Sequence, residues 1–271
     1  MHLPSSASAA TFSLWRHRRL VGSLTRREIL GRYRGSAGGL LWSLLTPILM
    51  LSVYTVVFSG IFQARWSAEA STPLDYALQL FVGLIVHGLA AEVLNRSPGL
   101  MLSNVSYVKR VVFPLETLPA VTLLSALFHA LISLVVLLVF FAMVKHTVPT
   151  QAFWLPLVWL PYLLLLSGVG WFLAGLGVYL RDIAQLTGLL TMILMFLSPV
   201  FYPASALPPR LQMLFQLNPL TVIIEQSRNV LLNNSPPDFL ALGLYSVMAV
   251  AVAVVGYRLF QTMKKGFADV L

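Results

Sequence analysis

Long runs of apolar residues dominate the chain, and short polar segments separate them. A helix needs roughly 17–25 residues to cross a ~30 Å hydrocarbon core. Six runs are long enough, and they cover 40–62, 74–95, 117–143, 153–180, 185–202 and 239–260. The fifth run is the shortest and ends at Ser198-Pro199. The pattern therefore predicts an all-α integral membrane fold with six transmembrane helices.

The segment 203–224 is also apolar, but prolines at 203, 208, 209 and 219 interrupt it. Within a membrane, irregular backbone must be buried in protein or line an aqueous space. We therefore expect short periplasmic re-entrant helices between spans five and six, and no seventh span.

Composition agrees with a membrane protein. Hydrophobic residues make up 58% of the 271 residues and charged residues only 10%, whereas a soluble domain carries about a quarter charged residues. The chain has no cysteine, which excludes disulfides, thiolate metal sites and a cysteine nucleophile.

The Lys and Arg residues are distributed unevenly between the two sides of the predicted spans. With a cytoplasmic N-terminus, fourteen lie inside and four outside, as the positive-inside rule favours. Those inside are Arg16, Arg18, Arg19, Arg26, Arg27, Arg32, Arg34, Arg96, Lys109, Arg110, Arg181, Arg258, Lys264 and Lys265; those outside are Arg65, Lys145, Arg210 and Arg228. This predicts a cytoplasmic N-terminal segment 1–39, a transmembrane domain 40–260 and a cytoplasmic tail 261–271. We expect no cleaved signal peptide. The net charge of +9 is explained by the basic residues on the cytoplasmic side of the membrane, and it does not indicate a nucleic-acid partner.

The N-terminal segment has an organised pattern of its own. Thr25 and Glu28 have the spacing of a capping box, and after them Ile29, Leu30, Tyr33, Ala37, Leu40 and Leu41 fall on one helical face. The pattern predicts an amphipathic helix in the cytoplasmic interface that runs into the first span. Its interface residues are Arg32, Tyr33 and Arg34. It acts either as an anchor on membrane lipid or as a contact for a cytoplasmic partner.

Signatures of catalysis are absent from the sequence. Neither a G-x-x-x-x-G-K-[ST] phosphate loop nor an H-E-x-x-H motif occurs, and we expect no catalytic residue, no metal site and no bound cofactor. Glu92 is the one acid in the interior of a predicted span, since Asp75 lies at the outer boundary of the same span, and this disfavours proton-coupled transport. His87 and His129 also lie in spans, either as neutral residues hydrogen-bonded between helices or as functional groups.

Five segments resemble one family in order along the chain. They are GRYRGSAGGLLWSLLTPILMLSVYTVVFSGIF (31–62), SYVKRVVFPLETLP (106–119), VYLRDIAQL (178–186), SPVFYP (198–203) and NPLT (218–221). Together they resemble the permeases of type-2 ABC exporters that move polysaccharides. Thr46 stands before Pro47 where that family often has Asn. Within the family the chain is most similar to O-antigen exporters, and less similar to capsule exporters, whose first-span region differs.

The resemblance implies an architecture and a mechanism. Two permeases form a homodimer in the bacterial inner membrane, and two copies of a separate cytoplasmic subunit bind and hydrolyse ATP. The cargo is a lipid-linked polysaccharide that moves from cytoplasm to periplasm. The connection 96–116 resembles a cytoplasmic coupling helix that contacts the ATPase through Tyr107, Lys109, Arg110 and Phe113. For Lys109 and Arg110, a solvated basic loop is the alternative. Arg181-Asp182 forms either a second contact or an internal ion pair.

Aromatic residues suggest the path of the polymer. Tyr54, Phe58 and Phe62 recur every four residues, and aromatic rings offer flat faces on which sugars stack much as bases do. Five further aromatic residues would complete a ring of side chains around this path: Trp171, Phe172, Phe196, Phe201 and Tyr202. Packing between helices or contact with lipid is the alternative for these side chains.

Two other function classes stay open on the sequence alone. One is a type-2 ABC permease for capsule, teichoic acid, drug or lipid. The other is an integral-membrane enzyme acting on a lipid-linked sugar, which would need an acidic or basic cluster at one membrane face.

Overall fold

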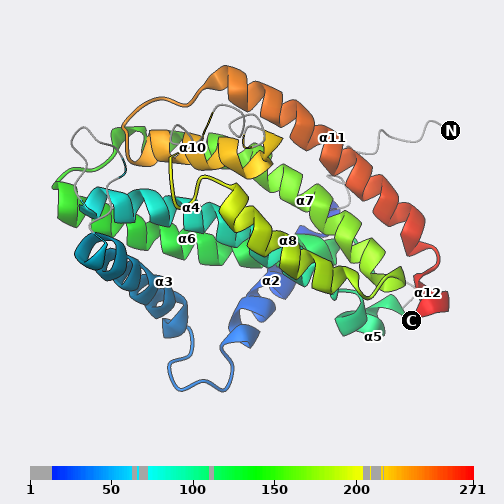
Figure 1. Cartoon of the computed structure of the whole chain (residues 1–271). Coiled ribbons are helices and arrows are strands. Elements are labelled where there is room, and N and C mark those ends of the chain that lie inside the picture. Colours follow the sequence, from blue (N-terminus) through cyan, green and yellow to red (C-terminus); the bar gives the residue numbers. More distant parts are fainter. Residues whose placement is uncertain are drawn as a thin grey trace.

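The computed structural model describes residues 14–62, 66, 73–109, 113–203, 208, 215 and 217–271, and every regular element in those ranges is helical. The longer helices are α2 (Arg18–Arg32), α3 (Leu41–Tyr54), α4 (Pro73–Arg96), α6 (Thr117–Lys145), α7 (Leu155–Tyr179), α8 (Ile183–Leu197), α10 (Pro219–Leu231) and α11 (Phe239–Lys264) (Figure 1). The π-helix η1 (Thr55–Ile61) continues α3, and the short elements are η2 (Leu102–Asn104), α5 (Val105–Val108), η3 (Thr150–Trp154) and α12 (Phe267–Val270).

Five helical segments among the described residues are long and apolar enough to cross a membrane. They are Leu41–Phe58, Leu74–Arg96, Thr117–Lys145, Thr150–Tyr179 and Phe239–Lys264. They confirm the helical membrane fold and fall where five of the predicted spans lie. The predicted fifth span, 185–202, corresponds to α8, which has 15 residues. At 1.5 Å per residue α8 is only ~22 Å long, so it is shorter than a full span.

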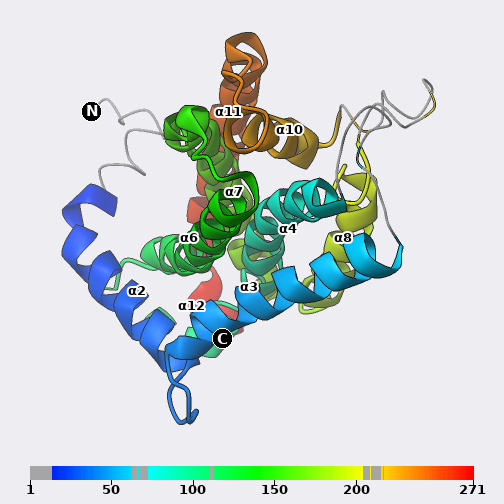
Figure 2. The same ribbon diagram turned by 90° about the vertical axis from the view of Figure 1, so that its left-hand side faces the viewer.

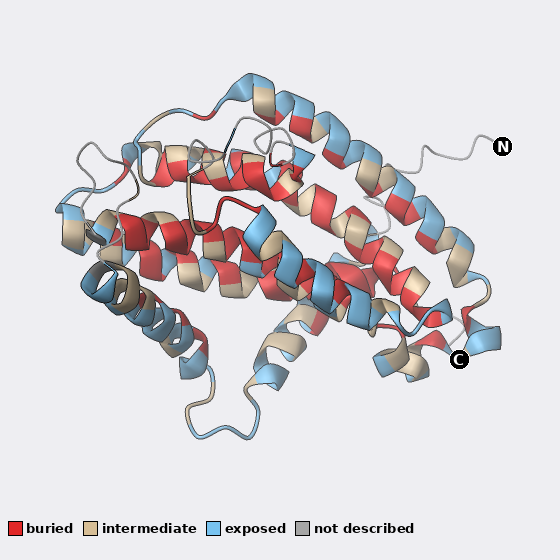
Figure 3. Cartoon of the chain, viewed as in Figure 1, coloured by how far each residue is buried: buried red, intermediate tan, exposed pale blue. Residues whose placement is uncertain are grey.

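The described helices form a bundle in which α4 and α7 are largely buried and α3, α6, α8 and α11 have broad exposed faces (Figure 3). α3 lies on one side of the bundle and crosses α4 at a steep angle (Figure 1, Figure 2). The exposed faces of α3 and α8 are apolar; they include Ile48, Leu49, Val53, Leu186, Leu189 and Met192. Such faces suit lipid or another protein.

The most extensive helix contact joins α7 and α11, and glycines make it close. A Cβ atom added to Gly168 would lie 2.6 Å from the Cα of Ala253, and one added to Gly256 would collide with the backbone of Gly168. Membrane helices pack by close backbone approach because lipid supplies no hydrophobic force between them. Close packing of their two backbones therefore holds α7 and α11 together.

The N-terminal segment differs from its prediction. Thr25 lies in the middle of α2, which begins at Arg18, so the proposed capping box at Thr25 and Glu28 is wrong. The helix also ends at Arg32 and does not run into the first span. Gly35 and Gly39 have φ angles of 87° and 48°, a left-handed conformation that glycine adopts without steric cost. These glycine turns break the amphipathic face that was expected to reach Leu41.

The region after α8 is described only in part, because 204–207, 209–214 and 216 lie outside the described residues. α10 begins after Asn218, whose side chain accepts a hydrogen bond from the Leu220 amide, and Pro219 occupies the first helical position. Both are favoured at a helix start. The Asn218 amide also donates to Ser198 Oγ at 2.9 Å, which ties α10 to the end of α8. The predicted re-entrant helices otherwise stay a prediction.

Candidate functional site: a charge ladder and an aromatic row

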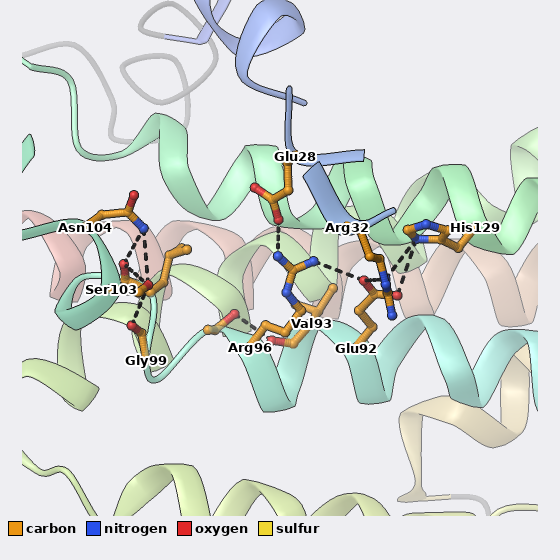
Figure 4. Close-up of polar contacts among 11 residues, drawn as sticks. Glu28, Arg32, Glu92, Val93, Arg96, Gly99, Ser103, Asn104 and His129 are labelled. Carbon is orange, nitrogen blue, oxygen red and sulfur yellow. Dashed lines mark hydrogen bonds and ion pairs between the residues drawn. The ribbon is translucent and has the colours of Figure 1, made fainter. Parts of the chain in front are cut away.

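Four charged side chains join α2 to α4 in a line of alternating sign, Glu28–Arg96–Glu92–Arg32, which we call the charge ladder (Figure 4). Arg96 contacts Glu28 and lies 3.0 Å from Glu92 Oε1. Arg32 Nη1 lies 2.6 Å from the same oxygen. Two carboxylates therefore face two guanidinium groups, and the ladder carries no net charge.

The ladder follows from helical spacing. Glu28 and Arg32 are four residues apart on α2, and Glu92 and Arg96 are four apart on α4, so each pair shares one face of its helix. Glu92 is the least exposed member, with 15% of its side chain accessible. The spacing is visible in the sequence, but only the fold shows that these two faces meet.

His129 on α6 extends the ladder. Its Nδ1 lies 3.2 Å from Arg32 Nη1 and 3.7 Å from Glu92 Oε2, and the second distance is too long for a hydrogen bond. A guanidinium group only donates, so Nδ1 accepts and the proton of a neutral ring lies on Nε2. That Nε2 atom is buried and has no hydrogen-bond partner among the described residues.

A cavity of about 420 Å³ opens beside the ladder, among the end of α2, α3, α4 and α6. We call it the polar cavity, because half or more of its lining side chains carry a polar group. Its lining includes Arg32, Tyr33, Ser43, Thr46, Tyr54, His87, Gly88, Glu92, His129 and Ser133. Its volume lies within the ~300–1,000 Å³ range of small-ligand sites. His87 Nε2 also donates to the Thr191 carbonyl at 2.9 Å, which is the interhelical role considered for it from the sequence.

The predicted aromatic stripe forms a connected row. The ring centroids of Tyr54 and Phe58 are 6.4 Å apart, and those of Phe58 and Phe62 are 5.9 Å apart. Tyr76 on α4 stacks on Phe58 at 5.4 Å, and its hydroxyl donates to the Phe201 carbonyl at 2.6 Å. Tyr76 thus links the stripe to the residues after α8. Sequence reasoning missed it, because nothing in the sequence indicates which face of α4 meets α3.

The other predicted ring members lie in two places. Phe196 stacks on Phe201 at 5.7 Å, and Tyr202 donates to the Phe196 carbonyl. Trp171 is buried in a separate cluster, where its Nε1 donates to the Glu116 carbonyl at 3.0 Å and its ring meets Tyr257 edge-on at 5.1 Å.

Phe172 packs at the edge of the main core. The structure therefore brings Phe196, Phe201 and Tyr202 toward the row, and it does not bring Trp171 there.

The segment predicted to contact an ATPase contains the short helix α5. Tyr107 stacks on Phe113, with ring centroids 4.4 Å apart and planes at 11°, and Arg27 of α2 donates to the Tyr107 hydroxyl at 2.8 Å. Lys109 is exposed at the end of α5. Arg110 lies outside the described residues.

The second predicted contact, Arg181-Asp182, occupies the turn between α7 and α8. Both residues are exposed, and no ion pair joins these two described side chains. The internal ion pair considered from the sequence is therefore not formed, and the contact with a partner stays a prediction.

A second buried charge was not anticipated. Arg228 on α10 is 2% exposed and donates to the Gln79 carbonyl at 2.9 and 3.1 Å and to the Val200 carbonyl at 3.2 Å. Its guanidinium lies 4.3 Å from the ring centroid of Trp66. Burial lowers the pKa of Arg228 to about 10, so it stays charged at neutral pH. Arg228 thereby joins α10, α4 and the segment after α8.

Within the described ranges, no group of three or more His, Cys, Asp or Glu side chains could hold a metal ion.

Comparison with known proteins gives a family match over most of the chain. A family model described as ABC-2 type transporter matches residues 19–232. The O-antigen export system permease protein RfbA of Klebsiella pneumoniae is 23% identical over 253 residues, which cover 93% of this chain and 95% of the relative. Its Myxococcus xanthus counterpart is 25% identical over 259 residues, covering 94% and 96%. The polysialic acid transport protein KpsM of Escherichia coli is 24% identical over 246 residues, covering 90% and 93%. The helical membrane fold and the match across 19–232 together establish that this chain belongs to the ABC-2 type transporter family.

Proposed function

We propose that this chain is the transmembrane permease subunit of an ATP-driven exporter that moves a lipid-linked polysaccharide of the O-antigen type from cytoplasm to periplasm. The observation that carries the proposal is the alignment over nearly the whole chain with permeases named for O-antigen export. The connected row Tyr54–Phe58–Phe62, with Tyr76 beside it, supports it. Flat rings bind sugars by stacking and still allow them to slide.

ATP hydrolysis belongs to a separate subunit in this proposal, and two permeases and two such subunits form the complex. The exposed Lys109 and the stacked Tyr107–Phe113 pair offer a surface for that subunit. The exposed apolar faces of α3 and α8 provide surfaces through which two permeases can associate. The Lys and Arg distribution supports an inner-membrane orientation with both termini in the cytoplasm.

Deletion and complementation in the native bacterium test the exported cargo. Deletion should abolish surface polysaccharide while the lipid-linked polymer accumulates inside the cell, and the wild-type gene should restore the surface polymer. Unchanged surface polysaccharide in the deletion strain would refute the proposal. The purified chain should show ATPase activity only together with its partner subunit, and turnover by the chain alone through further purification would contradict the division of labour.

The proposed ATPase contact has its own test. Charge reversal at Lys109 and Arg110 together with Tyr107→Ala should lower both co-purification of the ATP-binding subunit and export. Membrane insertion of the variant is checked by fractionation, and Arg181→Glu serves as the companion variant at the second proposed contact. Normal export and co-purification by the inserted triple variant would rule out this surface.

A further inference from the structure

We propose that the polar cavity is a binding site for one uncharged saccharide unit of the exported polymer, located within each permease at the start of the aromatic row. The inference rests on the proposed function and adds a defined subsite to it.

The charge balance of the cavity selects the ligand class. Arg32 is the cation that lines the cavity, and Glu92 already compensates it at 2.6 Å. Arg96, the next cation, lies between Glu28 and Glu92. A phosphate group entering the cavity would approach Glu92 and would have to displace it from both guanidinium groups. A neutral ligand carries no such cost.

Part of the remaining lining matches the chemistry of a sugar, and the rest, which includes Met50, Phe81 and Leu84, is apolar. Thr46 and Ser133 carry hydroxyl groups, and the rings of Tyr33 and Tyr54 supply flat faces. Burial raises the pKa of the Tyr33 phenol, which keeps it protonated and neutral.

Gly88 provides the space. It lines the cavity in the middle of α4, and an added Cβ atom would meet no atom within 4 Å. Tyr54 lines the same cavity and begins the aromatic row. A sugar released from the cavity therefore meets Phe58 next.

The first test fills the cavity. Gly88→Leu grows into open space and replaces a poor helix former with a good one, so the fold should tolerate it. Gly243→Leu is the matched control, since Gly243 is an exposed glycine on α11 with equally open surroundings and lies away from the cavity. We expect export to fall about tenfold in Gly88→Leu, as a ~1.4 kcal/mol higher barrier would give, and to stay at wild-type level in the control. Both should keep the wild-type melting temperature. Wild-type export by Gly88→Leu would overturn the proposal.

The second test reports occupancy without relying on transport. The natural chain has no cysteine, so a single introduced cysteine carries all the maleimide label that this chain takes up. Ser133→Cys lies in the cavity, and Ser52→Cys lies in an apolar groove between α3 and α6. In the complete complex, Ser133→Cys should label more slowly in cells that make the full polymer than in cells that cannot initiate it, while Ser52→Cys labels equally in both.

A third strain separates sugar from phosphate. Cells blocked after the first sugar transfer hold the lipid pyrophosphate without a chain. Full protection of Ser133→Cys in that strain would point to the phosphate headgroup and overturn the proposal, as would equal labelling in all strains. Protection that requires chain extension supports it. Failure of the proposed function itself has a different signature, because the deletion strain would then keep its surface polysaccharide.

Discussion

The contact between α2 and α4 and the contact between α7 and α11 are built on opposite principles. The first depends on four compensated charges, with 49% of the Arg32 side chain still accessible. The second depends on glycines that let two backbones touch. Partly solvated ion pairs separate at little cost because water and headgroups replace the partner. A close-packed seam loses its dispersion contacts at once when a gap opens. The charge ladder is therefore the weaker of the two contacts, and α2 is held in addition by its apolar packing on α6 through Val21 and Leu24.

The largest effect should come from the glycine seam. Gly168→Leu places a side chain where Ala253 Cα already lies, and overpacking of this kind costs ~3 kcal/mol or more. We expect low yield of folded protein and a clearly lower melting temperature in detergent. Gly22→Leu on α2, where an added Cβ meets nothing, is the control. An unchanged melting temperature in Gly168→Leu would mean that the seam is not close-packed.

Breaking the charge ladder should have a smaller effect on stability. Glu92→Gln leaves two guanidinium groups without their shared carboxylate. Loss of one partner costs several kcal/mol when fully buried and under ~1 kcal/mol when exposed, so we expect roughly 2 kcal/mol here. The double variant Glu92→Gln with Arg32→Gln should lose less than the sum of the single variants. Strict additivity by thermal unfolding would show that the ladder is not a coupled unit.

The aromatic row lies between these two kinds of contact, and its members should respond differently. Tyr54→Leu removes a ring that lines the cavity, so we expect export to slow about tenfold, given ~1–3 kcal/mol per stacked ring. Tyr54 is half-buried against the core, so the melting temperature of this variant should fall only slightly. Phe58→Leu removes a ring packed on Tyr76 and should lower both quantities. Surface polysaccharide and thermal unfolding measure the two effects. Full export by Tyr54→Leu would place this ring outside the path of the polymer.

The smallest effect is expected at Thr25. A capping threonine would cost ~1 kcal/mol on replacement by alanine. Thr25 instead lies within α2, and its buried hydroxyl has no partner among the described residues. Thr25→Ala should therefore change stability by less than ~0.5 kcal/mol. A clear loss of stability on thermal unfolding of Thr25→Ala would support the capping role that was predicted for Thr25.

Hydropathy along the sequence correctly predicted the positions of most membrane spans. Five spans lie within a few residues of their expected bounds, because burying backbone polar groups in lipid leaves only helices. The sequence could not predict which face of each helix points inward. Trp171 and Tyr54 are both aromatic residues within apolar runs, yet Trp171 is buried against Tyr257 and Tyr54 lines a cavity. The pairing of Glu28 with Arg96 and the burial of Arg228 likewise depend on which faces meet. The end of α2 was predicted too far along the chain. The apolar periodicity continues past Gly35, whereas the helix ends at Arg32 and Gly35 has a left-handed backbone.

The two left-handed glycines between α2 and α3 have a mechanical consequence. A continuous helix from Arg18 to the end of the first span would behave as a rod, and any rotation of α2 would be carried into α3 as torque. Gly35 and Gly39 interrupt that rod, and their backbone angles absorb twist locally. A change in the rotation of α2, which packs on α6 through Val21 and Leu24, therefore need not turn Tyr54 away from the cavity that it lines.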